Sequence, residues 1–224
     1  MKTFAKYSTL YFLFIVALSG CKKDGKKDEN TTNFPITLYA EKATVVSDTK
    51  VYVKGGLLND PKKNQELMWT YSRHFKLEQE LQNAGETFMT FIAKDSVDFF
   101  NRHSPYVISR NGEMLTLTSA IESISPLPVL QNQLYHHVAK YQSIKTEGNI
   151  EISKDIRIAY GNGYSEYKIP MFAYVTSSWI NGPVSGLNRR GGLVINEFNA
   201  DVINRIGDRD TIIVKTYLLT VKAK

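Results

Sequence analysis

The chain has one cysteine among its 224 residues, so its fold cannot depend on an internal disulfide. A sequence of this length is able to bury a substantial core as one domain. The hydrophobic fraction of 42% and the charged fraction of 22% are those of an ordinary globular protein. Aromatic residues reach 12%, which favours many β-strands or an exposed binding face. We therefore expect one domain that is held together by its apolar core.

The cysteine, Cys21, follows a segment with the features of a secretory signal. A basic start precedes the apolar stretch 9–18, which is shorter than the roughly 20 helical residues that span a bilayer. The sequence LSGC at 18–21 resembles the lipobox of bacterial lipoproteins, in which cleavage precedes the cysteine and acyl chains are attached to it. The resemblance implies a signal peptide at 1–20 and lipid attachment at Cys21. An ordinary secretory signal with an unmodified cysteine is the alternative.

The residues after the cysteine indicate a tether. Residues 22–33 include no apolar side chain and mix both charges, as in flexible, solvated linkers. Such a stretch resembles those of Bacteroidota lipoproteins, many of which face outward from the outer membrane. We expect a lipidated cysteine and tether at 21–34 and a single globular domain at 35–224. The expected location is the cell envelope, with the lipid in the outer membrane and the domain either surface-exposed or periplasm-facing. The net charge is +6, but the lysines are scattered and give no case for nucleic acid.

Apolar patterns and turn residues predict the local structure of the domain. Strands are expected at 34–46, 49–58, 87–93, 155–160, 164–175 and 211–222, and a hairpin at 106–118 with Asn111-Gly112 in its turn. Helices are expected at 65–84, at 95–100 after an Asp-Ser cap and at 129–141, and irregular chain at 176–192. This order predicts an α+β fold, a mostly antiparallel sheet with two or three helices packed at one side.

Catalytic and metal-binding motifs are scarce. The four histidines form no H-E-x-x-H pattern, and no second cysteine is present to complete a zinc site, so we expect no metal and no cofactor. No G-x-S-x-G nucleophile turn occurs. The carboxylates of Asp95, Asp98 and Glu113 form a catalytic pair only if the fold brings two of them together. We expect a non-catalytic role, with a carboxylate-dependent hydrolase as an alternative.

Three stretches occur in an order that is similar to that of the fasciclin-type domain. They are TFIAKDSVDFF (90–100), LYHHV (134–138) and VINEFNADVI (194–203), followed by a final apolar strand. The resemblance covers about residues 65–221 and implies a wedge of β-sheet with flanking helices and a role in adhesion. In that family, the pair that matches Tyr135 and His136 is discussed both as an adhesion determinant and as a packing element. Both interpretations stay open here, although packing is the commoner role of an inward-facing histidine.

These features together favour an adhesion or interaction module on a membrane anchor. The segment 176–192 carries Trp179, Arg189 and Arg190, and tryptophan and arginine are enriched at binding hot spots. The same segment is equally consistent with a long irregular connection. The alternative is a glycan-binding accessory lipoprotein of a polysaccharide uptake system, in which Trp69 and Trp179 stack on sugar rings. The expected partners are the membrane, through the lipid, and a protein or glycan ligand, but no nucleic acid.

Overall fold

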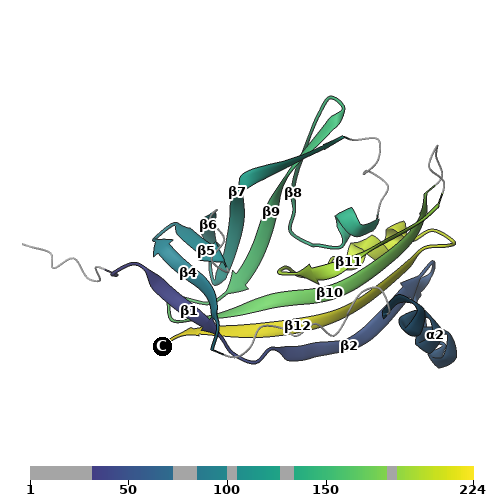
Figure 1. The fold of residues 1–224 in the computed structure, drawn as a ribbon, viewed down its shortest axis with the longest axis horizontal. Helices are drawn as coiled ribbons and strands as arrows, with labels where there is room; N and C mark the ends of the chain where they lie inside the picture. Colours follow the sequence, from purple (N-terminus) through teal and green to yellow (C-terminus); the bar gives the residue numbers. More distant parts are fainter. Residues whose placement is uncertain (1–31, 73–84, 100–104, 127–133, 181–185) are drawn as a thin grey trace, which may run out of the picture. The chain divides into compact units, whose positions relative to one another are not determined.

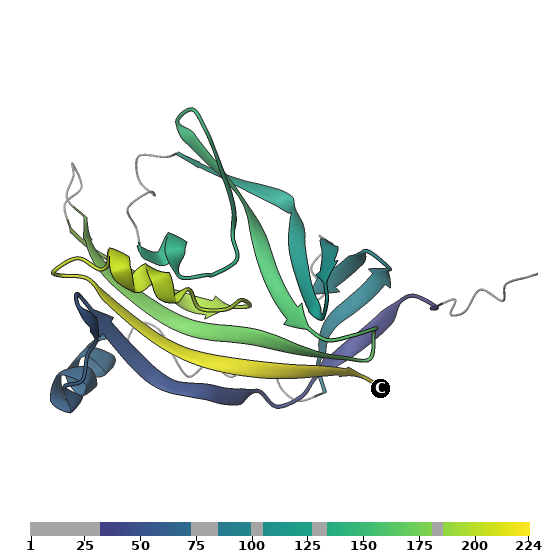
Figure 2. The same ribbon diagram turned by 180° about the vertical axis from the view of Figure 1, so that it is seen from behind.

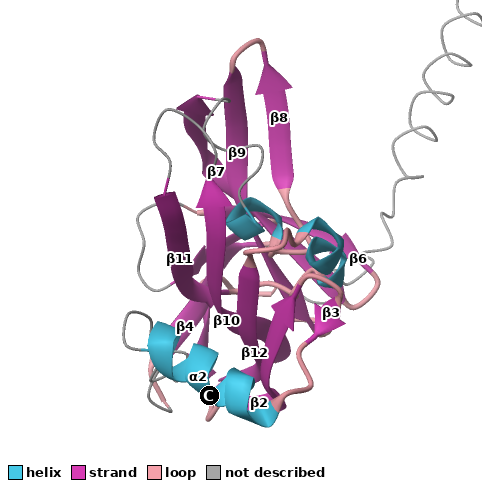
Figure 3. Ribbon diagram, turned by 90° about the vertical axis from the view of Figure 1, so that its right-hand side faces the viewer, coloured by secondary structure: helices cyan, strands magenta, loops and turns pink. Residues whose placement is uncertain are grey.

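Extended segments dominate the described part of the chain. The structure, a computed structural model, describes residues 32–72, 85–99, 105–126, 134–180 and 186–224. Phe34–Lys224 form one compact unit. The described residues of this unit form strands, the α-helix α2 (Pro61–Ser72) and two short 3-10 helices (Figures 1 and 3). The 3-10 helices are η2 (Leu134–His137) and η3 (Ala200–Arg205). No helix in these residues has the length and apolar character needed to cross a bilayer.

Eight strands close into an antiparallel barrel. Each strand pairs with the next one around the barrel, and the last strand pairs back with the first. In this order they are β1 (Ile36–Ala40), β4 (Thr87–Ala93), β5 (Ser96–Phe99), β6 (Tyr106–Asn111), β7 (Met114–Pro126), β9 (Ile150–Tyr160), β10 (Glu166–Ile180) and β12 (Thr211–Ala223). Closure leaves every one of these strands with a partner on both sides over part of its length, which removes open edges there.

Further strands extend the barrel along its long members. β2 (Thr44–Val53) lies along β12 and pairs with the short β3 (Gly56–Leu57), and β11 (Gly186–Val194) lies along β10. β8 (Ser143–Glu147) pairs with the first half of β9. The sheet therefore reaches well beyond the closed ring at the end where β8 and β11 lie.

Aromatic rings form the centre of the main core. Phe88, Phe91, Phe99 and Tyr167 are each at most 1% exposed. The ring centroids are 5.7 Å apart for Phe88 and Phe99 and 5.6 Å apart for Phe91 and Tyr167. Each aromatic pair at such a distance contributes about 0.5–1.5 kcal/mol beyond the burial of its area. The high aromatic content of the sequence is thus used largely inside the barrel.

β9 and β10 separate directly after their shared turn. They pair at one position, Tyr160 with Lys168. Beyond it β9 runs beside β7 and β8, whereas β10 runs beside β11 and β12 (Figures 1 and 2). The turn starts at Gly161, where a Cβ atom would lie 2.3 Å from a backbone carbonyl oxygen. Both views place η2 and η3 between the diverging strands, where they pack on small apolar clusters that include Leu134 and Val202.

The α+β prediction is wrong, because the described residues are mostly strand and close into an eight-stranded antiparallel barrel that carries only short helices. Residues 95–100 contain β5, since Val97 and Phe99 are buried at a spacing of two. Of the predicted helix 129–141, residues 134–137 form a single 3-10 turn and residues 129–133 lie outside the description. The predicted irregular stretch 176–192 is instead the end of β10 and most of β11, with 181–185 outside the description.

Other local predictions are confirmed in whole or in part. Residues 87–93 form β4, and β12 matches the expected final strand. The 106–118 hairpin forms, although Asn111 pairs with Met114 and the turn residues are therefore 112 and 113. α2 covers the start of the predicted helix 65–84, whose residues 73–84 lie outside the description. The break expected between the strands 34–46 and 49–58 is wrong, because β2 continues through positions 47 and 48.

Candidate functional site

A polar cleft of about 190 Å³ lies in the region where β9 and β10 diverge. Its walls come from η2 and the chain after it, from β8 and neighbouring residues of β9, and from Val194 at the end of β11 and Asn196 just beyond it. Its apolar lining consists of Ala139, Ile144, Ile156 and Val194, and its polar lining of Tyr135, His136, Tyr141, Gln142, Ser143, Glu151, Ser153, Lys154, Asp155 and Asn196. Pockets for drug-sized ligands usually measure about 300–1,000 Å³, so this cleft suits a single side chain or a small group.

Glu151 is the buried carboxylate of the cleft. The residue is 7% exposed, although its neighbour Ile150 is 37% exposed. Its Oε1 atom lies 3.9 Å from Nδ1 of His136. Among the described residues, no lysine or arginine nitrogen lies within ion-pair distance of this carboxylate. The basic group within ion-pair distance of this carboxylate in the described part of the chain is therefore an imidazole.

The surroundings of His136 disfavour its charged form. Burial lowers the pKa of His136, and His137 and Arg190 lower it further, while Glu151 opposes them. An imidazole with a pKa below its usual value of about 6.5 carries little positive charge at neutral pH. Its Nε2 atom is buried and has no hydrogen-bond partner among the described residues. His136 therefore supplies no countercharge to Glu151, and one ring nitrogen is left unsatisfied.

Tyr135 is covered by its neighbours. Its ring centroid lies 4.0 Å from that of His136 and 5.7 Å from the guanidinium carbon of Arg190. Burial raises the pKa of the Tyr135 hydroxyl, Arg190 partly offsets this, and Glu151 adds to it. Arg190, on β11, is exposed and does not line the cleft. The ring of Tyr135 thus joins η2 to β11 and helps to position His136.

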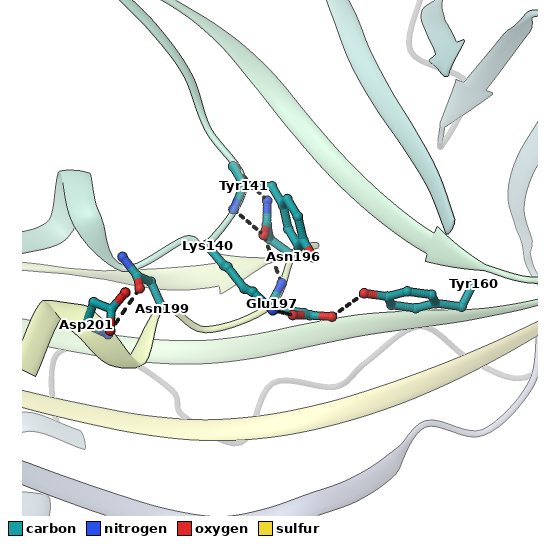
Figure 4. Close-up of polar contacts among 7 residues, drawn as sticks. All are labelled: Lys140, Tyr141, Tyr160, Asn196, Glu197, Asn199 and Asp201. Atoms are coloured by element: carbon teal, nitrogen blue, oxygen red, sulfur yellow. Dashed lines mark hydrogen bonds and ion pairs between the residues drawn. The ribbon is translucent and has the colours of Figure 1, made fainter. Parts of the chain in front are cut away.

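Asn196 connects the walls of the cleft (Figure 4). It is 1% exposed, and its side chain makes four hydrogen bonds. Its amide nitrogen donates to the carbonyl oxygens of Tyr141 (3.0 Å) and Ile156 (2.9 Å). Its oxygen accepts from the backbone N–H groups of Tyr141 (3.2 Å) and Glu197 (2.9 Å). One side chain therefore links the segment before β8, strand β9 and the segment before η3.

A second polar network lies beside Asn196. Glu197 accepts hydrogen bonds from Lys140, at 2.5 Å, and from the Tyr160 hydroxyl (Figure 4). Burial raises the pKa of Glu197, but the bonds from Lys140 and Tyr160 outweigh this and lower it overall. Burial and the bond to Glu197 raise the pKa of Tyr160. These groups are mutually satisfied, so we assign them to the support of the cleft.

A wider hollow of about 600 Å³ lies elsewhere, where β1 meets the C-terminus of β12. Its Lys222 is held by Glu41 at 3.2 Å and Glu166 at 3.6 Å, and its Lys224 lies 4.1 Å from the ring centroid of Tyr39. These charges have partners already. The smaller cleft, with an uncompensated buried charge, is therefore the better candidate site.

The structure brings together only some of the predicted site residues. Tyr135, His136 and Arg190 lie side by side, although η2 and β11 are far apart in sequence. Arg189 lies next to Arg190 on β11 but does not line the cleft. Trp179 pairs with residue 187 in the β10–β11 hairpin, and its side chain lies outside the description, as does Cys21. The exposed Trp69 is on α2.

Glu151 and Asn196 are the site residues that the sequence analysis missed. Asn196 lies within the third fasciclin-like stretch, but only the folded chain shows its four partners. Glu151 had one available signal, a carboxylate that alternates with Ile150 and Ile152 within a strand-like pattern. Comparisons of the chain with protein families, with curated proteins and with solved structures find no match.

Proposed function

We propose that the protein is a membrane-anchored, extracytoplasmic interaction module that binds a partner through the cleft and catalyses no reaction. The observation that carries the proposal is the buried carboxylate of Glu151, which has no lysine or arginine partner among the described residues. A buried ion without a partner costs several kcal/mol, and chains keep such groups where a ligand makes use of them. The cleft is small and has a preformed wall, as a docking pocket for one group of a partner requires.

The position of the carboxylates argues against the hydrolase. Glu151 and Asp155 both line the cleft but lie four residues apart on one strand, or about 13 Å along the backbone. Glycosidase carboxyl pairs are separated by only about 5–9.5 Å. In addition, Asp155 already accepts hydrogen bonds from Tyr106 at 2.6 Å and Arg157 at 3.1 Å. Neither carboxylate has the partner that an acid–base pair needs.

The aromatic residues of the cleft give little support to the glycan alternative. Sugar binding by stacking requires an aromatic face that is free, and the ring of Tyr135 contacts His136 and Arg190. Tyr141 lies against the ammonium of Lys140, 5.2 Å from its ring centroid. A protein partner is therefore favoured over a glycan.

The anchor is proposed from the sequence. Cys21 would carry acyl chains, each buried methylene of which contributes about 0.8 kcal/mol to membrane binding. Residues 22–33 would separate the domain from the outer membrane. Cys21→Ser is expected to release the full-length protein from the membrane fraction without detergent, whereas the parent chain stays bound. An unmodified thiol at Cys21 in mass spectrometry of the mature protein would contradict the anchor.

Site-specific photo-cross-linking in intact cells tests the binding role. A photoreactive residue at Ser143, which is exposed and lines the cleft, is expected to capture one defined partner protein. The same residue at the exposed Lys50 on β2 serves as the matched control and should not capture it. Glu151→Gln is expected to reduce the Ser143 product. Equal products from both positions, or binding of a glycan array instead, would refute the proposal.

A further inference from the structure

We infer that the cleft accepts a nitrogen cation at the end of an aliphatic chain, the chemistry of a lysine side chain. This inference rests on the proposed interaction role and names the group that the cleft binds. It starts from the charges that line the cleft. Lys154 is paired with Glu122 at 3.2 Å, and Asp155 is paired with Arg157 at 3.1 Å. Among the described lining residues, Glu151 is thus the charge left without an oppositely charged partner.

Among the described residues, the surroundings of Glu151 include no lysine or arginine that pairs with it. His136 is the described basic group within ion-pair distance of its carboxylate, and burial lowers the pKa of this imidazole, so it carries little positive charge at pH 7. The guanidinium of Arg190 lies against the Tyr135 ring and outside the lining. The unsatisfied Nε2 atom of His136 is a second, independent sign that the polar groups here are incomplete. A ligand cation would supply the opposite charge that Glu151 lacks among the described residues.

The lining also specifies what carries the cation. Ile144, Ile156 and Val194 provide apolar walls, and Ser143 and Ser153 add hydroxyl groups to the lining. An ammonium has three donors and no acceptor, so a carboxylate and hydroxyl oxygens match it. Its aliphatic stem lies on apolar surface while the charged end makes polar contacts. A metal ion fits poorly, because no three His, Cys, Asp or Glu side chains gather in the described part of the chain.

The stability of Glu151→Gln separates a ligand-binding carboxylate from a structural one. If Glu151 has no charged partner, the neutral glutamine of similar shape removes the free-energy cost of burying its charge. The melting temperature then stays the same or rises. If Glu151 holds the fold through an ion pair, the substitution lowers the melting temperature. Glu147→Gln on β8 is the matched control, because Glu147 is exposed, pairs with Lys145 and does not line the cleft.

The test uses residues 22–224, which contain the whole compact unit Phe34–Lys224. Titration with n-butylammonium is expected to shift NMR signals of cleft residues and to raise the melting temperature of the parent chain. Neutral n-butanol and sodium ions at the same concentration should do neither. Glu151→Gln should weaken n-butylammonium binding by about tenfold or more, the value of a charged hydrogen bond, while Glu147→Gln leaves it unchanged.

The source of the cation is decided by a second ligand. A short lysine-containing peptide that binds more tightly than n-butylammonium indicates a partner protein, whereas equal binding indicates a free amine. The inference is overturned if n-butanol binds as well as n-butylammonium, if Glu151→Gln keeps full binding, or if that variant melts at a clearly lower temperature. If one of these outcomes occurs while a residue at Ser143 still captures a partner, the proposed interaction role stands. Only the inference that the cleft binds a cation is then rejected.

Discussion

Asn196→Ala tests whether the cleft is held by one buried amide. The substitution removes four hydrogen bonds and leaves the backbone groups of Tyr141, Ile156 and Glu197 without their partner. Each such bond has a net value of about 0.5–1.5 kcal/mol, and water from the cleft replaces part of it, so we expect a loss of about 3 kcal/mol. For a unit of this size, that corresponds to a fall in melting temperature of about 6–12 °C.

The assay is urea denaturation of residues 22–224, followed by circular dichroism. Two other asparagines provide a graded series. Asn199 makes two side-chain hydrogen bonds, to the Asp201 N–H and the His137 carbonyl, and exposed Asn162 makes one to Glu113. The losses of stability should decrease in the order Asn196, Asn199, Asn162. A loss below about 1 kcal/mol for Asn196→Ala, or one no larger than that of Asn162→Ala, would refute the reasoning.

Two further predictions concern the support of the cleft and the turn at its base. Because the folded-state pKa of Glu197 is lowered, its contribution to stability is present above about pH 4.3 and is lost as the pH falls through the folded value. The stability difference between the parent chain and Glu197→Gln should therefore shrink from pH 7 to pH 3 in denaturation curves, and a constant difference would contradict this. Gly161→Ala should cost about 1–3 kcal/mol, because its Cβ would lie 2.3 Å from a carbonyl oxygen. Gly192→Ala, which meets nothing within 4 Å, should change stability by less than about 0.5 kcal/mol, and equal effects of the two would refute the steric argument.

Local sequence patterns predicted the elements whose signals are themselves local. β4 and β12 are rich in β-branched and aromatic residues, and the 106–118 hairpin has an Asn-Gly pair near its turn. The helix expected at 95–100 shows the limit of such signals. Asp95 and Ser96 resemble a helix cap, but the burial of Val97 and Phe99 on one side of a strand prevails. Tertiary packing, not capping preference, decides the structure of a segment this short.

The closure of the barrel could not be predicted, because it depends on pairs that are distant in sequence. β1 pairs with β12, so Leu38 lies opposite Ala223. No turn residue or periodic pattern specifies such a partner. The same holds for the cleft, where Tyr135 was identified through the fasciclin resemblance and Arg190 by its residue type, but their contact across η2 and β11 was not predicted. The fasciclin resemblance led to the wrong architecture because short apolar motifs do not determine which strands pair.

The first half of β9 carries its hydrophobic pattern in reverse. Ile150 is exposed, whereas Glu151 is buried. Ile124 on the neighbouring strand β7, which lies on the same face of the sheet as Ile150, is 65% exposed. A slip of one residue would bury the isoleucines and release Glu151 to water, which the hydrophobic effect alone favours. The pairing of β9 with both β7 and β8 opposes this slip, and so does the bond from Asn196 to the Ile156 carbonyl. The fold therefore keeps a carboxylate inside the cleft against the local hydrophobic preference of β9. Such a disagreement between local preference and structure is expected at functional sites.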